Sequence, residues 1–352
     1  MDKFFSLASL FVSLGLLLCV FLCPAPGKLP GEDRAPRAFS LSNADGWFCD
    51  RLPMRYALLR FNRDAELLLG KNEYRGAFFG RDGVLFSEEE TCAETLKANL
   101  RAISDFESRA ALPVLTLLVG GKADILTEYT PRFYASEREE LVEMFRGSSL
   151  SKVDVFPALR YAGGIGKYIY YRGDHHLTSL GAYYCYAALG SALGYTPYEA
   201  ADFSISVVDS AFSGSDARRL LVETNDTIAL YRYRGDSALY VKNPDTGSTH
   251  RGLYYEEKLL GSDKYSVFLG GNAGHLEVRG EEKRPRLLIV RDSYASAAAP
   301  FLARHFDLDL VDLRYTNVSV HRLVRENEYA AVLFFFGMDT LAQNEILFKL
   351  GI

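Results

Sequence analysis

The sequence predicts an α/β fold built on a mainly parallel sheet. Three short apolar runs near the C-terminus, residues 286–290, 308–313 and 330–336, alternate with segments of helical character at about 295–305 and 318–327. Strands that alternate with helices in this way are typical of parallel sheets, because each crossover places a helix over one face. The composition agrees with a packed globular domain, since 48% of the 352 residues are hydrophobic.

Before residue 200 the chain alternates between helical and strand-like segments. Their apolar residues recur at helix or strand spacing, and glycines or N-cap residues mark several of their ends. In order, we expect a helix at Leu52–Leu69, a hairpin of Ala77–Phe79 and Val84–Phe86, a helix at Glu88–Ala111, a strand at Leu112–Val119, a helix at Glu137–Phe145, a strand at Lys167–Tyr171 and a helix at about Thr178–Leu193.

From about residue 200 to 285 the pattern is strand-like, for example at Tyr265–Leu269. The sequence leaves open whether these strands form an insertion or an antiparallel extension of the main sheet. We treat residues 38–352 as one domain that contains this region.

The N-terminus holds a long apolar run. Residues Phe4–Cys23 carry no charge and end at Pro24, and the run has about the length that spans a bilayer as a helix. We expect residues 1–23 to form an uncleaved signal anchor, with a cleaved signal peptide as the alternative. Residues 24–37 are rich in proline and glycine and are predicted to be a linker. The predicted location is the cell membrane, crossed once, with the globular domain outside the cytoplasm.

Charge and cysteine content restrict the function classes. The formal charge of −5 offers no broad basic surface, which argues against nucleic acid as a partner. The five cysteines include no CxxC pair, which argues against a zinc site. We expect no metal and no cofactor. A disulfide between Cys49 and Cys92 is compatible with an exported domain but is not our first interpretation.

Two short motifs carry the chemistry. Asp174-His175-His176 offers an acid and a base two residues apart, and Asp292-Ser293 offers a hydroxyl where an apolar strand gives way to a helix. A serine hydroxyl is a weak nucleophile and needs a base in reach, which in turn needs an orienting partner. We therefore predict Ser293 as the nucleophile, His176 as the base and Asp174 as the acid that orients it.

Each motif also has a plainer interpretation. Asp292 and Ser293 could serve only to cap the following helix. His175 is expected to face away from His176 in an extended loop and to be structural. A metal site built from Asp174, His175 and His176 is a further alternative, although adjacent histidines diverge and no other His/Cys cluster is visible.

An acyl-transfer site also needs hydrogen-bond donors for the oxyanion. The candidates are the backbone N–H of Ser293 and the side chain of Arg314, which follows the next predicted strand. A surface ion pair is an equal alternative for Arg314. Tyr294, together with Asp292 and His175, is a secondary candidate for a role at the site.

Four segments carry a longer ordered pattern. They are Phe79–Leu85, Tyr170–Tyr183, Leu287–Leu302 and Asp312–Tyr315. This set resembles the DHHW family of bacterial exported proteins, which are related to the alginate O-acetyltransferase proteins of the SGNH (GDSL-like) hydrolase superfamily. The resemblance covers nearly the whole chain after the predicted anchor.

The resemblance implies a three-layer α/β/α, flavodoxin-like domain with a Ser-His-Asp triad. Ser293, His176 and Asp174 would take the three roles. The implied activity is transfer or removal of acetyl groups on an exopolysaccharide or cell-wall glycan. The implied partner is a membrane-bound O-acyltransferase that hands the acetyl group across the membrane.

Two positions depart from the family pattern. Leu177 stands where the family has tryptophan, and Met338 stands where the superfamily has an asparagine that serves the oxyanion hole. These departures keep a second interpretation open. In that interpretation the chain is a degenerate, non-catalytic member that binds glycan or serves as a scaffold in a polysaccharide-modification complex.

Overall fold

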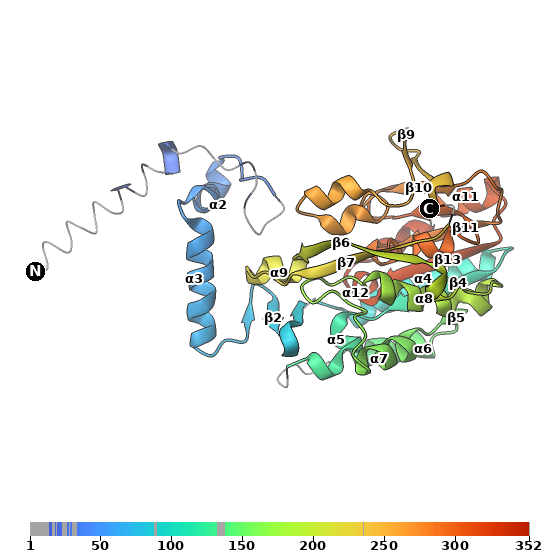
Figure 1. Ribbon diagram of the computed structural model, residues 1–352, viewed down its shortest axis with the longest axis horizontal. Helices are drawn as coiled ribbons and strands as arrows, with labels where there is room; N and C mark the ends of the chain where they lie inside the picture. The colour runs from blue at the N-terminus through green and yellow to red at the C-terminus, as the bar shows by residue number, and fades with distance from the viewer. Residues whose placement is uncertain are drawn as a thin grey trace, which may run out of the picture.

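The computed structural model describes residues 34–87, 90–131, 138–234 and 236–351, with a few isolated residues before 34. Its centre is an eight-stranded sheet in the order β5-β4-β13-β11-β12-β10-β8-β9. The first five strands run parallel; they are β5 (Lys152–Val153), β4 (Val114–Val119), β13 (Ala331–Gly337), β11 (Arg286–Arg291) and β12 (Asp307–Val311). The predicted α/β fold with a mainly parallel sheet is confirmed (Figure 1).

The central parallel strands are covered on both faces. Every residue of β13 is buried, as is Leu287–Val290 of β11. A continuous apolar run is what a strand covered on both sides requires, whereas a half-exposed strand would alternate. Since parallel strands end at one edge, the residues that follow β11 and β13 lie side by side there.

Helices form a layer on each face of the sheet. On one face, Phe106 of α4 (Ala93–Arg109) meets Phe334 of β13 edge to face at 5.5 Å and lies 4.7 Å from the ring of His321 in α11 (Val320–Glu326). On the other face, Phe301 of α10 (Ala299–Leu302) packs against Tyr183 and Tyr186 of α8 (Ser179–Leu193). Right-handed crossovers explain this arrangement, because β11 to β12 and β12 to β13 step in opposite directions across the sheet.

The region from 200 to 285 divides into two parts. Strands β8 (Tyr240–Asn243), β9 (Ser248–Arg251) and β10 (His275–Arg279) extend the main sheet in antiparallel fashion, with β10 beside β12. Strands β6 (Ser204–Phe212) and β7 (Asp226–Arg232) pair with each other in a separate sheet, and α9 (Ser215–Leu220) lies between them in the chain.

Three predicted elements differ in the structure. The expected strand at Tyr265–Leu269 is wrong, because Lys264–Val267 forms a 3₁₀ helix, η7, whose apolar side chains are buried; a short apolar run suits either state. The expected strand at Lys167–Tyr171 is reduced to one bridge between Tyr170 and Leu177. The expected helix at about 295–305 is broken into η8 (Ser293–Ala295) and the short helix α10.

The remaining elements flank the sheet. They are α2 (Ala44–Arg51), α3 (Arg55–Leu68), β1 (Glu73–Tyr74), β2 (Ala77–Phe79), β3 (Leu85–Ser87), α5 (Lys122–Ile125), α6 (Glu139–Gly147), α7 (Phe156–Gly164) and α12 (Met338–Gln343). The predicted hairpin is the antiparallel pair β2–β3. Most of the predicted anchor, Phe4–Cys23, lies outside the described residues and stays a prediction. Among the helices that are described, none combines the length and the apolar character needed to cross a membrane.

Candidate active site

The Asp174-His175-His176 loop is held at its base by backbone hydrogen bonds. Tyr171 N–H donates to the carbonyl of His176 at 3.3 Å, and Thr178 N–H donates to the carbonyl of Ile169 at 3.0 Å. The Thr178 hydroxyl caps α8 by accepting the N–H of Gly181 at 3.2 Å. The loop is therefore short and is held at its base next to the N-terminus of α8, which fixes the direction of its side chains.

Ser293 follows the carboxyl end of β11. Asp292 caps the turn by accepting the N–H of Tyr294 at 2.9 Å, and its second oxygen accepts the N–H of Gly337 at the end of β13 at 2.8 Å. Asp292 thus ties two neighbouring strand ends together, while Ser293 remains partly exposed. The capping interpretation holds for Asp292, and it leaves the hydroxyl of Ser293 available. Burial raises the pKa of Asp292, partly offset by the positive charge of Arg314.

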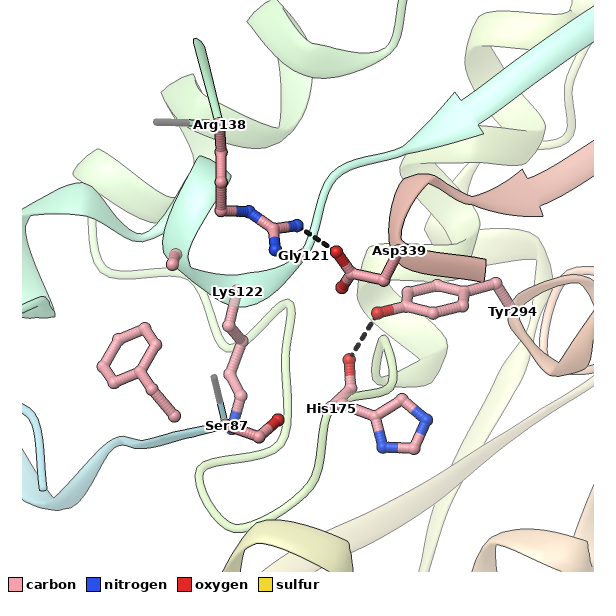
Figure 2. Close-up of a pocket in the computed structure, with 9 residues that line it drawn as sticks. Ser87, Gly121, Lys122, Arg138, His175, Tyr294 and Asp339 are labelled. Atoms are coloured by element: carbon pink, nitrogen blue, oxygen red, sulfur yellow. Dashed lines mark hydrogen bonds and ion pairs between the residues drawn. The ribbon is translucent and has the colours of Figure 1, made fainter. Parts of the chain in front are cut away.

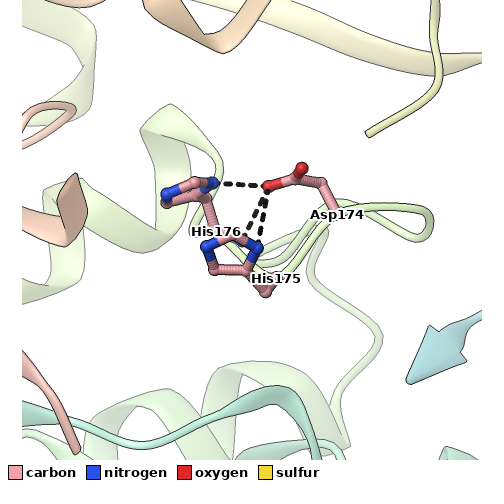
Figure 3. Close-up of side chains that lie close together, drawn as sticks. All are labelled: Asp174, His175 and His176. Atoms are coloured by element: carbon pink, nitrogen blue, oxygen red, sulfur yellow. Dashed lines mark hydrogen bonds and ion pairs between the residues drawn. The ribbon is translucent and has the colours of Figure 1, made fainter. Parts of the chain in front are cut away.

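The fold brings Asp174, His176 and Ser293 into one hydrogen-bonded chain. His176 Nδ1 lies 2.6 Å from Asp174 Oδ1, and His176 Nε2 lies 2.8 Å from Ser293 Oγ. With its proton on Nδ1, the imidazole donates to the carboxylate and accepts from the serine hydroxyl. Figure 3 shows the short link between Asp174 and His176. This is the relation of nucleophile, base and orienting acid that general-base catalysis requires.

The carboxylate of Asp174 is buried and fully engaged. Its Oδ1 also accepts the backbone N–H of His176 at 3.0 Å, and its Oδ2 accepts the N–H of Ser215, at the start of α9, at 2.8 Å. Burial by itself raises the pKa of Asp174. The positive charge of His176 and His175 and these hydrogen bonds outweigh burial and hold the pKa well below its usual value. Asp174 therefore remains the ionised partner of the imidazole.

Two aromatic residues enclose His176. The ring of Tyr265, from η7, stacks on the imidazole with centroids 3.8 Å apart and planes 11° apart. The ring of Tyr294 lies 5.6 Å away, and its hydroxyl donates to the carbonyl of His175 at 2.9 Å. Sequence reasoning missed Tyr265 and Ser215, because both come from the region 200–285, where no motif marked them.

The other predicted residues fall at or near the site. His175 is about two-fifths exposed, and its Nδ1 lies 2.8 Å from the hydroxyl of Ser215. The expectation that His175 faces away from His176 is wrong, because the loop is not extended there and the two rings lie 3.8 Å apart. Arg314 forms a two-pronged ion pair with Asp312, at 2.9 Å and 2.7 Å, so the ion-pair interpretation holds for two of its nitrogens. Leu177 and Met338 are both fully buried, which places the two departures from the family pattern in the core.

A small cavity lies beside His175 and Tyr294, which both line it. Its volume is about 20 Å³, room for about one water molecule. Arg138, paired with Asp124 and Asp339, and Lys122 line it together with Gly121 (Figure 2). Desolvation disfavours the Arg138 cation, but the two carboxylates outweigh it and raise the pKa of Arg138. Lys122 is paired with Asp216 at 2.7 Å, so both cations at this cavity have carboxylate partners and we interpret the network as structural.

Two groups of residues have the ligand types and spacing of a metal site. Within the described residues these are Asp174, His175 and His176, and separately His275, Glu277 and Asp309. In the first group both nitrogens of His176 already have hydrogen-bond partners. In the second, Asp309 binds two arginines. His275 Nε2 has no hydrogen-bond partner, but the two arginines on Asp309 already supply positive charge there, so neither donor set fits a metal well.

Residues 142–311 match the family model described as DHHW protein, a span that includes the Asp174 loop and Ser293. The resemblance to the DHHW family is confirmed. No curated protein sequence matches the chain.

Solved structures agree in fold. A DHHW family protein from Eubacterium siraeum superimposes with a TM-score of 0.66 at 19% identity, covering 78% of this chain and 94% of that one. Bacillus cereus PatB1 superimposes with a TM-score of 0.64 at 19% identity, covering 75% and 97%. A PatB1 structure with a sulfonyl adduct gives 0.62 at 17%, with the same coverage. At these identities the likeness establishes the shared fold.

Proposed function

We propose that the protein is an extracytoplasmic serine O-acetyltransferase or acetylesterase that acts on an exopolysaccharide or cell-wall glycan. The observation that supports the chemistry is the hydrogen-bonded chain from Asp174 through His176 to Ser293 at the carboxyl edge of the sheet. The resemblance to the DHHW and alginate O-acetyltransferase proteins supports the choice of acetyl as the transferred group and of a glycan as the substrate. Anchoring by residues 1–23 and a membrane-bound O-acyltransferase as acetyl supplier belong to the same proposal.

The reaction proceeds in two balanced steps. Ser293 Oγ attacks the carbonyl carbon of an acetyl donor while its proton passes to His176 Nε2, and the donor oxygen then leaves with that proton. The product is an acetyl ester on Ser293. In the second step a sugar hydroxyl or water gives its proton to His176 and its oxygen attacks the ester carbonyl. The bond from the acetyl carbon to Ser293 Oγ breaks, His176 returns the proton to Ser293 Oγ, and the acetylated sugar or acetic acid leaves. Asp174 holds the imidazole and stabilises the imidazolium in both steps.

Charge on the carbonyl oxygen needs donors fixed in advance. Ser293 opens the turn η8, so its N–H has no partner inside that turn, and we assign it as the first donor. Arg314 is the proposed second donor. Asp312 accepts hydrogen bonds from Nε and Nη2 of Arg314. The third nitrogen, Nη1, donates to no acceptor among the residues that the structure describes, so it is the nitrogen proposed to bind the oxyanion. Burial, which disfavours the cation, is outweighed by Asp312 and Asp292, so the pKa of Arg314 is raised and the charge is permanent.

The proposal is tested with a chromogenic acetyl ester. Wild type should release the chromophore, and Ser293→Ala and His176→Ala should not. Ser108→Ala, an exposed serine on α4 that lies in neither motif, is the matched control and should behave as wild type. A sugar acceptor that gains acetyl while hydrolysis falls would identify transfer; unchanged hydrolysis would identify an esterase. A folded wild type that turns over no ester would favour the non-catalytic scaffold instead.

A further inference from the structure

Tyr265 covers one face of the catalytic imidazole. The two rings lie 3.8 Å apart and within 11° of parallel, closer to face-to-face than the other aromatic contacts of His176 with Tyr294 and His175. Tyr265 comes from η7, far in sequence from both motifs. Its side chain is buried, so the contact is shielded from solvent.

The same tyrosine also reaches the nucleophile. Its hydroxyl donates to the backbone carbonyl of Ser293 at 3.3 Å. Burial raises the pKa of Tyr265 well above its ordinary value, which keeps the phenol protonated and able to donate. One residue therefore contacts the base through its ring and the turn of the nucleophile through its hydroxyl.

Tyr265 is itself firmly supported. Tyr171 packs edge to face against its ring at 6.2 Å, and Phe268 lies 5.1 Å away. Its neighbour Lys264 forms an ion pair at 2.6 Å with Asp209 of β6. Tyr255 N–H donates to the carbonyl of Val267 at the end of η7 at 2.8 Å. These contacts fix the segment against β6 and give the ring a defined position.

The hydrogen bonds of His176 act on its ring nitrogens, in the plane of the imidazole, and do not restrain the two faces of the ring. Asp174 and Ser293 hold Nδ1 and Nε2, but two hydrogen bonds in the plane of the ring leave it some freedom to tilt. A flat partner against the face removes this freedom. We propose that Tyr265 is a positioning residue that keeps His176 Nε2 aligned with Ser293 Oγ, a role that rests on the proposed function of the triad.

The first test measures how fast Ser293 reacts with phenylmethanesulfonyl fluoride. In this reaction Ser293 Oγ bonds to sulfur, the S–F bond breaks and His176 takes the proton. Tyr265→Leu should slow labelling by about 10- to 100-fold, because small misplacement of a base is costly. Tyr265→Phe keeps the ring and should stay within about threefold of wild type. Rescue by phenylalanine separates stacking from the hydroxyl bond to Ser293.

A matched control comes from the same segment. Tyr254 is a partly buried tyrosine that packs against Phe268, and its hydroxyl donates to the carbonyl of Tyr231 at 2.7 Å without contacting the triad. Tyr254→Leu should label at the wild-type rate. Equal slowing by Tyr254→Leu and Tyr265→Leu would overturn the proposal, because it would show general loosening of the segment.

A double-mutant cycle shows whether Tyr265 acts through the histidine. In a His176→Ala background, Tyr265→Leu should cause no further slowing, since the group that it positions is gone. A full additional loss in that background would contradict the proposal.

A readout without chemistry separates this inference from the proposed function. The NMR signal of the His176 ring protons should be displaced by the ring current of Tyr265, should move in Tyr265→Leu and should stay in Tyr265→Phe. An unreactive wild type that shows this pattern would refute the proposed function and leave the ring contact established. A signal that does not move in Tyr265→Leu would overturn the positioning role.

Discussion

Two regions of the molecule bring a buried aspartate against a histidine, yet only one of these two histidines contacts a serine hydroxyl. At the carboxyl edge of the sheet, Asp174 bonds His176 at 2.6 Å and His176 reaches the partly exposed Ser293. In the middle of β12, Asp309 lies 3.7 Å from His275 of β10. The first pair leads to a nucleophile, and the second does not.

The difference lies in what else each carboxylate binds. Asp309 forms ion pairs with Arg279 at 2.7 Å and with Arg286 at 2.6 Å. Its negative charge is therefore neutralised by two arginines, which stay protonated. Asp174 receives only N–H groups and imidazole, so its charge is available to the base. Residue types and spacing alone do not distinguish a catalytic pair from a structural one; the additional partners do.

The first prediction has the largest expected effect. It concerns variants that disrupt the Asp174–His176 site and leave the Asp309–His275 pair intact. His176→Ala and Ser293→Ala should each lower kcat/KM for a chromogenic acetyl ester by about 10³- to 10⁴-fold, because the base and the nucleophile act as a unit. His275→Ala should stay within about twofold of wild type. Steady-state kinetics on folded variants decides the matter, and a comparable loss in His275→Ala would erase the distinction.

The second prediction disrupts the ion pairs of Asp309 and leaves the Asp174–His176 site intact. Asp309→Asn should destabilise the fold by about 3 kcal/mol, because two arginines lose a fully buried partner. Activity per folded molecule should be preserved. The control is Asp307→Asn on the same strand, where one carboxylate oxygen has no hydrogen-bond partner among the described residues, and the cost should be under about 1 kcal/mol. Urea unfolding measures both; equal costs would show that the ion pairs do not matter.

A glycine beside Asp174 offers a smaller, local disturbance. A Cβ at Gly214 would lie 2.2 Å from Cβ and Oδ2 of Asp174, so the carboxylate must shift. Gly214→Ala should lower kcat/KM by about 100-fold through misplacement of His176. Gly147→Ala, where a Cβ meets nothing within 4 Å, is the control. Wild-type kinetics from a folded Gly214→Ala protein would mean that Asp174 need not be held so closely.

The smallest expected effect is the pH dependence of stability. Burial would raise the pKa of Asp309, but His275 and the two arginines outweigh it and hold the pKa far below the usual value. A depressed carboxyl pKa contributes stability that is present above the unfolded value, about 3.9, and is lost as the pH falls through the folded value. The difference in the free energy of unfolding between wild type and Asp309→Asn should therefore become smaller below about pH 4. A difference that is constant from pH 7 to pH 3 would argue against this source of stability.

The sequence could predict much of this arrangement, for physical reasons. The strands at 286–290 and 330–336 are legible because strands buried on both faces must be continuously apolar. Asp174, His176 and Ser293 are recognisable because a weak nucleophile needs those partners. Tyr265 and Ser215 are not predictable in this way, since a stacking ring and a backbone N–H carry no spacing rule. The apolar run that contains Tyr265 suits a strand as well as a buried turn, and only tertiary packing decides between them.

The most direct test of the central claim is the intact mass of the globular domain after mixing with an activated acetyl ester. We expect a gain of one acetyl group on Ser293 that is absent in Ser293→Ala and strongly slowed in His176→Ala. Peptide mapping would place it on Ser293. A folded domain that hydrolyses the ester without acetylation of Ser293, or that acetylates equally well in Ser293→Ala, would contradict the proposal that these three residues form the catalytic site.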